Sequence, residues 1–409
     1  MVYFLIPISF LAIVPTLNET NNLFRSLIIP LLILIILVKT KLKYTGLKIY
    51  YFLGFFHLSW YIIGWYLVKN QSGADFLLGA YGRSFGFITL ATMYLAFILS
   101  ATNSINKINS LFTSFKILTI LTLFYGVIQV LHLDPLKWSV PVGTILLTVG
   151  NINFSSVLLA IVSIFLLSQL IHSVGNKIYY IFGYLIAVIL TIQTNSYQGI
   201  SIVTLCTILL LIQNNKNKKL IIKVMVILQF TLILPLTLYL AKDTKRRDWI
   251  ASILENQLQV SARINHWNTG INIWLDNFWV GVGIDNMMSY SASYISEEGI
   301  KNLGGYTIID RSHNVIIDQF AQGGLFSGLI WIWFCSSIFY TIIRIRKSKN
   351  SRVPLWKVNF LELVWLAYFL QSLISTDQIL LQLIGMIAAG TLAGIWREIK
   401  VDGLNNDKF

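Results

Sequence analysis

A histidine stands directly before a long apolar stretch in the segment "RSHNVIIDQFAQGGLFSG", which runs from Arg311 to Gly328. Serine is a favoured helix-capping residue, so the sequence predicts that Ser312 caps a helix that His313 begins. The partial positive charge of a helix N-terminus disfavours imidazolium and leaves a neutral ring able to take a proton near pH 7. His313 is therefore a candidate general base. The alternative is an interfacial histidine bonded to a neighbouring carbonyl group.

Arginine guanidinium groups are well suited to pair with phosphate oxygens, because their planar fork donates two hydrogen bonds at once. The basic residues expected on the same face as His313 are Arg83, Lys242, Lys245, Arg246, Arg247, Arg263, Lys301 and Arg311. Several arginines near one neutral base indicate a phosphate-bearing substrate, and fixed cations can stabilise the charge that a departing diphosphate gains. For the run "KDTKRR" a solvated charge cluster is the favoured alternative.

Two further segments combine glycine with hydrogen-bonding side chains. They are "TVGNINFSS", which contains Asn153, and "TNSYQG", which contains Gln198. A third, "GAYGRSFGF", surrounds Arg83. Such segments form tight turns that present polar groups where a substrate could be held, although ordinary turn chemistry explains each of them equally well.

The segment "SARINHWNTGINIWLDNFWVGVG" begins with Arg263 and places apolar side chains at the spacing of one helical face. The residues of this face are Ile264, Trp267, Ile271 and Trp274. Tryptophan prefers the head-group level of a bilayer, so we expect an interfacial helix here, with Trp267 close to a bound substrate. A packed surface helix without a catalytic part is the alternative.

A polar stripe of Asn314, Asp318 and Gln322 follows His313 at a spacing of four. It either lines a cavity or bonds to a neighbouring helix. Gly324 and Gly328 form a GxxxG pair, which is typical of close helix packing.

The composition places these segments in a membrane protein. Of the 409 residues 56% are hydrophobic and 12% are charged, and the mean hydropathy is +0.70. Runs long enough to span a bilayer recur along the chain. The sequence predicts an all-α, polytopic fold of about 12 transmembrane helices, near residues 3–17, 26–39, 47–68, 86–103, 115–133, 154–173, 178–194, 199–213, 220–240, 316–343, 355–375 and 377–396.

Most Lys and Arg residues fall in alternate loops and in the C-terminal tail, which predicts that both termini are cytoplasmic. The short outer loops hold only Arg25, Lys69, Arg83 and Lys137. Residues 1–409 are expected to form a single membrane domain, with one large extracytoplasmic loop, residues 241–312, between predicted spans 9 and 10. The N-terminus shows no cleavable signal-peptide pattern. The net charge of +14 is accounted for by this loop asymmetry and by contact with anionic lipids, so no nucleic-acid partner is expected.

Familiar cofactor and metal motifs are absent from the sequence. It contains no GxxxxGK[ST] loop, no HExxH and no DxD carboxylate pair. Cys206 and Cys335 both fall within predicted spans, where cysteine behaves as a small apolar residue. We therefore expect no cofactor and no metal.

The residues so far described resemble the O-antigen ligase and polymerase superfamily. The similarity covers roughly residues 75–330 and rests on "GRSFGF", "GNINFSS", the Arg263-to-Trp267 segment with Gly281 and Gly283, and "SHNVIIDQFAQGGLFSG" in that order. The resemblance implies a membrane-embedded, GT-C-like glycosyltransferase of the bacterial cytoplasmic (inner) membrane. The donor would be a glycan on a polyprenyl diphosphate, and the acceptor a glycan, a lipid A core or a protein. By position, His313 matches the general base, Arg263 an arginine that binds the diphosphate, and Arg83 a further arginine of the family pattern.

One position departs from that pattern. Family members often carry a Ser-Arg-Gly sequence where this chain has Ser196, Tyr197, Gln198 and Gly199. Gln198 donates hydrogen bonds without a charge, so either Arg311 or Lys245 compensates or the donor is held differently.

The sequence therefore predicts an inverting, metal-independent glycosyltransferase with His313 and Arg263 as catalytic residues. Arg83, Arg311, Asn314, Gln198, Asn153 and Trp267 are the predicted substrate-binding residues. The sequence leaves open whether the reaction is polymerisation or ligation. A transporter or flippase of lipid-linked glycans is the alternative from another class, and a catalytically inactive scaffold is the third.

Overall fold

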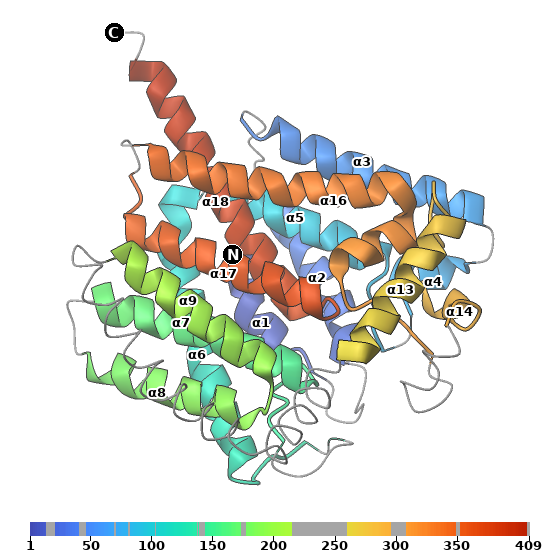
Figure 1. The fold of residues 1–409 in the computed structure, drawn as a ribbon. Helices are drawn as coiled ribbons and strands as arrows, with labels where there is room; N and C mark the ends of the chain where they lie inside the picture. Colours follow the sequence, from blue (N-terminus) through green and yellow to red (C-terminus); the bar gives the residue numbers. More distant parts are fainter. Residues whose placement is uncertain are drawn as a thin grey trace, which may run out of the picture.

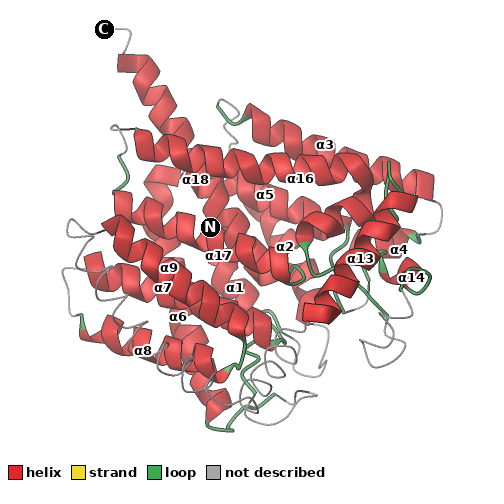
Figure 2. Cartoon of the chain, viewed as in Figure 1, coloured by secondary structure: helices red, strands yellow, loops and turns green. Residues whose placement is uncertain are grey.

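The structure is a computed structural model. It describes residues 1–13, 21–40, 46–68, 71–80, 82–102, 104–136, 138, 144–172, 177–214, 260–295, 308–348 and 352–406. Throughout these ranges the regular elements are helices, and no strand is present (Figure 2). The predicted all-α class is confirmed for this part of the chain.

The helices follow the hydrophobic segments of the sequence (Figure 1). In chain order they are η1 (Val2–Phe4), α1 (Leu5–Leu11), α2 (Asn21–Val38), α3 (Lys48–Val68), α4 (Gly73–Leu78), α5 (Phe87–Thr102), α6 (Ser104–Val130), α7 (Ile152–His172), α8 (Ile178–Gln193), α9 (Tyr197–Asn214), α13 (Val260–Asp276), α14 (Met288–Ser291), α16 (Val315–Lys347), α17 (Leu355–Ile374) and α18 (Ile379–Asn406).

Six helices of the described ranges are long and apolar enough to cross a membrane. They are Lys48–Val68, Ile105–Val130, Ile152–His172, Val315–Lys347, Leu355–Ile374 and Ile379–Val401. Each of the other predicted spans except one overlaps a shorter apolar helix, and the ninth, residues 220–240, lies outside the described residues. A polytopic membrane fold is thus supported, while the count of twelve spans stays a prediction.

The long helix α18 begins inside the fold, packs against α5, α16 and α17, and projects beyond the other helices at its C-terminal end (Figure 1). Its sequence is rich in small residues, which let helix backbones approach closely in a membrane. At Gly390 a Cβ atom would lie 2.1 Å from the Ser100 Oγ and 2.2 Å from the Phe97 carbonyl oxygen of α5. Glycine at this position therefore sets the distance between the two helices.

Two groups of helices pack within the fold. Helices α7, α8 and α9 pack together on one side, and α3, α13 and α16 on another (Figure 1). Helices α4, α13 and α14 gather near the N-terminal end of α16. The polar residues singled out in the sequence come from both groups and from the segment between α4 and α5.

The sequence predicts that Arg25 lies in a short outer loop, but the residue lies inside α2. Its side chain is fully buried, where Nε donates to the Ser9 carbonyl at 2.8 Å and a terminal nitrogen donates to the Thr148 carbonyl at 2.6 Å. A buried guanidinium needs such acceptors because desolvation of the charge is costly. Arg25 therefore connects three segments of the chain, and it should not be counted among the loop residues that predict the orientation in the membrane.

The predicted span 316–343 is not one continuous helix, because the chain breaks at Gly324. This residue has φ 69° and ψ −166° inside α16, a conformation that favours glycine. A Cβ at this position would lie 2.1 Å from the Trp279 carbonyl oxygen. The GxxxG pair thus marks a break as well as a close contact.

The carbonyl groups exposed by the break are bonded to the segment that follows α13. The N–H groups of Val282 and Gly283 donate to the carbonyls of Ala321 and Gln322 at 3.0 and 2.9 Å, and the Leu325 N–H donates to the Phe278 carbonyl at 2.9 Å. A helix end inside a membrane protein needs such partners. The break therefore fixes the segment 278–285 against the first part of α16.

Candidate functional site

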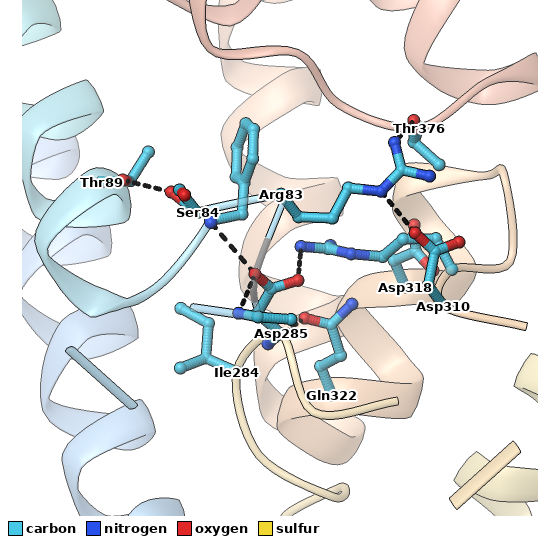
Figure 3. A network of polar contacts seen from close by, with 12 residues as sticks. Arg83, Ser84, Thr89, Ile284, Asp285, Asp310, Asp318, Gln322 and Thr376 are labelled. Atoms are coloured by element: carbon cyan, nitrogen blue, oxygen red, sulfur yellow. Dashed lines mark hydrogen bonds and ion pairs between the residues drawn. The ribbon is translucent and has the colours of Figure 1, made fainter. Parts of the chain in front are cut away.

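The loop between α4 and α5 folds around the carboxylate of Asp285. The Oδ2 atom of Asp285 accepts hydrogen bonds from the backbone N–H groups of Ala80 at 2.8 Å and Phe85 at 3.0 Å (Figure 3). Gly79 has φ 85°, and a Cβ there would lie 2.4 Å from the same oxygen. A residue with a side chain would prevent the loop from closing on the carboxylate. The loop that carries Arg83 is thus fastened to Asp285.

The other oxygen of Asp285 pairs with Arg311. This ion pair is buried, with side-chain exposures of 8% for Arg311 and 1% for Asp285. The guanidinium also lies 5.6 Å from the centroid of the Phe85 ring. Burial acts to lower the pKa of Arg311, but Asp285, Asp318, Asp310 and Asp377 outweigh it and raise the pKa. Arg311 therefore joins the Arg83 loop to the segment that leads to His313.

Arg83 points to a different carboxylate. Its Nε atom pairs with the Asp310 carboxylate, and its terminal nitrogen donates to the Thr376 hydroxyl at 3.2 Å (Figure 3). Both side chains of the ion pair are 29% exposed. Burial favours the neutral form of Asp310, but Arg83, Arg311 and His313 outweigh it, so the pKa of Asp310 lies below its usual range. The Arg83–Asp310 pair is the accessible ion pair of the site.

The capping residue of α16 differs from the prediction. Asn314, not Ser312, is the N-cap, and its Oδ1 atom accepts from the N–H groups of Ile316 at 3.0 Å and Ile317 at 3.3 Å. The Ser312 backbone N–H and hydroxyl instead each donate to the Asp318 carboxylate at 2.7 Å. The helix begins at Val315, and His313 precedes the cap with φ 58°. His313 is thus held in a left-handed turn, which is uncommon for a residue with a side chain.

The polar side chains of α16 bond to the segments before α16 and after α13, and not to a neighbouring helix as one of the two predicted alternatives had it. Asp318 accepts from Ser312, and the Gln322 side-chain oxygen accepts from the Asp285 backbone N–H at 2.8 Å. Together with the Asn314 cap, these contacts fix the segment 311–314 above the helix. They leave the imidazole of His313 partly exposed.

A second histidine lies against His313. The imidazole rings of His266 and His313 stack with centroids 4.7 Å apart and planes inclined by 20°. Burial, together with the nearby His266, Arg83 and Arg263, lowers the pKa of His313 to about 3, and Asp310 acts in the opposite direction. Burial and Arg263 likewise lower the pKa of His266, although Asp310 opposes them. Both rings are therefore neutral near pH 7, as predicted for His313, but burial and nearby cations are the cause.

Helix α13 forms as predicted and carries Arg263, His266 and Trp267 in its first turns. Gly270 lets it approach α16 closely, because a Cβ there would lie 2.8 Å from Ile317 and 2.9 Å from Ser312. Ile264 and Ile271 are exposed on the opposite face. Burial lowers the pKa of Arg263. The indole N–H of Trp267 is buried and has no hydrogen-bond partner among the described residues.

Asn153 and Gln198 lie at the N-terminal ends of α7 and α9, and neither takes part in the ion pairs of Arg83 and Arg311 or in the His266–His313 stack. The Ser196 hydroxyl donates to the Asn153 side-chain oxygen at 2.8 Å, and the Ser156 hydroxyl donates to Ser196 at 3.1 Å. Gln198 is 7% exposed, and both polar atoms of its amide lack partners in the described structure. The predicted site residues thus form two groups.

Sequence reasoning missed four residues of the first group: His266, Asp285, Asp310 and Thr376. Asp310 and His266 stand beside residues that were singled out, so their proximity in sequence was an available signal. Asp285 and Thr376 meet Arg311 and Arg83 only through the fold. Among the described residues, no group of three or more His, Cys, Asp or Glu side chains is arranged to hold a metal ion.

Fold and site together define a polytopic membrane protein that is helical throughout its described residues and whose polar site is lined by arginine and histidine. Residues 179–332 match the family model described as O-antigen ligase. The match confirms the predicted resemblance of this segment to the O-antigen ligase and polymerase superfamily. It indicates a function of the O-antigen ligase type in polysaccharide biosynthesis. A comparison with curated proteins gives no significant match.

The matched segment covers both groups of predicted site residues only in part. It contains Gln198, Arg263, Trp267, Arg311, His313 and Asn314, whereas Arg83 and Asn153 lie outside it. Arg83 nevertheless contacts the matched segment through Asp310. The N-terminal part of the chain thus contributes Arg83 to the site.

Proposed function

We propose that the protein is an inverting, metal-independent glycosyltransferase that moves a glycan from a polyprenyl diphosphate to an acceptor hydroxyl. The observation that carries this proposal is the neutral, partly exposed imidazole of His313. The charges of Arg83 and Arg263 act on this ring. A base and fixed cations are the two groups that such a transfer requires. The match of residues 179–332 to the O-antigen ligase family supports the same reaction class.

Arg83 and Arg263 bind the donor diphosphate in this proposal. Arg83 is the more accessible of the two ion-paired arginines of the site, with 29% of its side chain exposed against 8% for Arg311. Arg311 contributes positive potential and positions the segment 311–313 through its pair with Asp285. Buried cations close to a phosphate act more strongly than cations in water.

The acceptor hydroxyl gives its proton to His313 as its oxygen attacks the anomeric carbon of the sugar. The bond from that carbon to the diphosphate oxygen breaks on the opposite face, and the electron pair leaves with the diphosphate. The configuration of the sugar is therefore inverted. Trp267 and Asn314 flank the base and contact the sugars, while Asn153 and Gln198 hold a more distant part of the substrate. Gln198 is suited to this role because its buried amide has no described protein partner.

The site faces the outside of the bacterial cytoplasmic membrane, and both termini face the cytoplasm. The asymmetric distribution of Lys and Arg among the loops supports this orientation. The prenyl chain of the donor lies in the lipid beside the helices, and the acceptor is a glycan, a lipid A core or a protein.

Reconstitution into liposomes with a purified polyprenyl-diphosphate glycan and an acceptor glycan tests the proposal. The wild-type protein should release free polyprenyl diphosphate and yield a lengthened or transferred glycan. His313→Ala should lower the transfer rate by about 100-fold or more, the usual contribution of a general base. Movement of the glycan lipid across the bilayer without bond cleavage would favour a transporter, the alternative from another class.

A further inference from the structure

The two ion pairs of the site differ in accessibility. Arg311 and Asp285 are 8% and 1% exposed and are fixed by additional backbone bonds, whereas Arg83 and Asp310 are each 29% exposed. A partly exposed pair is held less firmly than a buried one, because water screens its charges, and it can be exchanged at lower cost. A buried pair resists separation, since either charge left alone is strongly destabilising. Arg83–Asp310 is therefore the pair that an incoming anion can open.

Asp310 also acts on the proposed base. The charged or titratable groups that act on His313 come from three elements: His266 and Arg263 from α13, Arg83 from the loop between α4 and α5, and Asp310 from its own segment. Asp310 is the one negative charge in this described set, and it raises the pKa of His313 while the others lower it. The same carboxylate thus pairs with an arginine and acts through its charge on a histidine three residues away in the sequence.

A diphosphate that binds Arg83 must compete with the Asp310 carboxylate, because both are anions that pair with the same guanidinium. We propose that the donor diphosphate displaces Asp310 from Arg83 and that the released carboxylate becomes the counter-ion of His313. Asp310 is then a positioning residue that couples donor binding to the basicity of His313. This inference rests on the proposed function and names a regulation of the same site.

The charges balance through the cycle. Before the donor binds, Asp310 neutralises Arg83 and His313 is a weak base surrounded by cations. With the diphosphate on Arg83, the carboxylate faces His313, and the proton from the acceptor hydroxyl produces an imidazolium beside an anion. Departure of the polyprenyl diphosphate and loss of the proton restore the Arg83–Asp310 pair. The base is thus strengthened only when a leaving group is in place.

Asp310→Asn separates this role from a structural one, because it should raise the affinity for the donor and lower the rate of glycan transfer. The variant removes the competitor for Arg83, so the affinity for a short-chain polyprenyl diphosphate probe should rise by about two- to fivefold, in keeping with an exposed ion pair. It also removes the counter-ion, so kcat for glycan transfer should fall by about 10- to 100-fold. A merely structural loss lowers both quantities.

The pH dependence supplies a second reading. The profile of kcat/KM reports the free enzyme, and the profile of kcat reports the donor complex. In the wild type the acidic limb of kcat should lie at higher pH than that of kcat/KM, and Asp310→Asn should abolish this separation. Asp276→Asn is the matched control, because it removes an exposed carboxylate from the end of α13. It should leave both affinity and limbs unchanged.

Weaker probe binding by Asp310→Asn together with a lower kcat would overturn the inference, as would a wild-type profile with coincident limbs. If this variant does not fold, Arg83→Gln tests the coupling instead, because it removes the partner of Asp310 permanently. The acidic limb of its kcat/KM profile should then lie at higher pH than in the wild type. An unmoved limb in Arg83→Gln then refutes the coupling. Failure of the proposed function looks different, since the wild type itself would neither bind the probe nor transfer glycan.

Discussion

The imidazole ring of His266 stacks on that of His313, with ring centroids 4.7 Å apart and planes inclined by 20°. The first ring comes from α13 and the second from the turn before α16, so this contact forms where two elements meet. Two stacked imidazoles cannot both carry a proton without mutual repulsion. The stack therefore helps to keep His313 neutral and fixes the plane of its ring.

Substitutions at His266 should separate the stacking from the charge. His266→Phe preserves a flat ring without a titratable group, so the transfer rate at pH 7.5 should remain within about threefold of wild type, as for a change in packing alone. His266→Lys places a permanent charge beside His313, which costs an imidazolium about 1 to 3 kcal/mol at this distance, so the rate should fall by about tenfold or more. Initial rates of glycan transfer measure both effects. Equal rates for the two variants would refute an electrostatic role for this contact.

Stability should depend on pH through His313. Its pKa is about 3 in the folded protein, below the value of about 6.5 expected in an unfolded chain. The unfolded state therefore takes up a proton first as the pH falls, so the stability contributed by the neutral ring is complete above pH 6.5 and is lost towards pH 3. Thermal unfolding in detergent between pH 7.5 and 4.5 should show this decline. The decline should be smaller in His313→Gln, and an identical decline in the variant would contradict the assignment.

Hydropathy located most of the helices because the signal for a membrane helix is local. A run of apolar residues needs no distant partner to be recognised, and the predicted spans near 47–68, 154–173 and 355–375 agree with α3, α7 and α17 within a few residues. The ends were harder to predict. Ser312 and Asn314 are both good capping residues, and the choice between them depends on Asp318, which binds Ser312 from the next turn.

The arrangement of the candidate site depends on distant contacts that no local pattern encodes. Asp285 binds the loop around Ala80 and Phe85 across about two hundred residues of sequence. Gly324 resembled a helix-packing residue, and only the approach of Trp279 explains why the helix breaks there. The grouping of His313 with arginines could be predicted because these segments bear charges that a membrane core excludes, which places them at the ends of the helices.

Arg83 and Arg263 should bind a diphosphate more tightly than lysine or alanine would at the same positions. Replacing either arginine by alanine removes charge-assisted hydrogen bonds worth about 1.5 to 3 kcal/mol, so the dissociation constant of polyprenyl diphosphate should rise by about 10- to 100-fold. Arg83→Lys and Arg263→Lys keep the charge but lose the planar fork, so intermediate values are expected. Binding titrations at two salt concentrations measure this, and unchanged affinity in both alanine variants would remove the arginines from the donor site.

Asp285 should be essential for the stability of the site as well as for activity. Asp285→Asn leaves Arg311 buried without its closest counter-ion, a change that typically costs about 3 to 5 kcal/mol. The double variant Asp285→Asn with Arg311→Met removes both charges and should regain part of the lost stability. Gly79→Ala provides an independent check, because its Cβ would lie 2.4 Å from the Asp285 carboxylate. Thermal unfolding should rank the double variant above Asp285→Asn, and the reverse order would show that the ion pair is not the main contact.

Gln198 should reveal a conflict between stability and substrate binding. Its amide is buried at 7% exposure, and its two polar atoms lack partners among the described residues. An unsatisfied buried polar group costs about 1 to 3 kcal/mol, so Gln198→Met, which fills a similar volume without polar atoms, should raise the melting temperature in detergent. If the amide binds the glycan donor, the same variant should raise KM by about tenfold, the loss of roughly one hydrogen bond. Ser156→Ala, which changes the adjoining cluster without touching the amide, is the control. A variant that gains stability with an unchanged KM would assign Gln198 to packing alone.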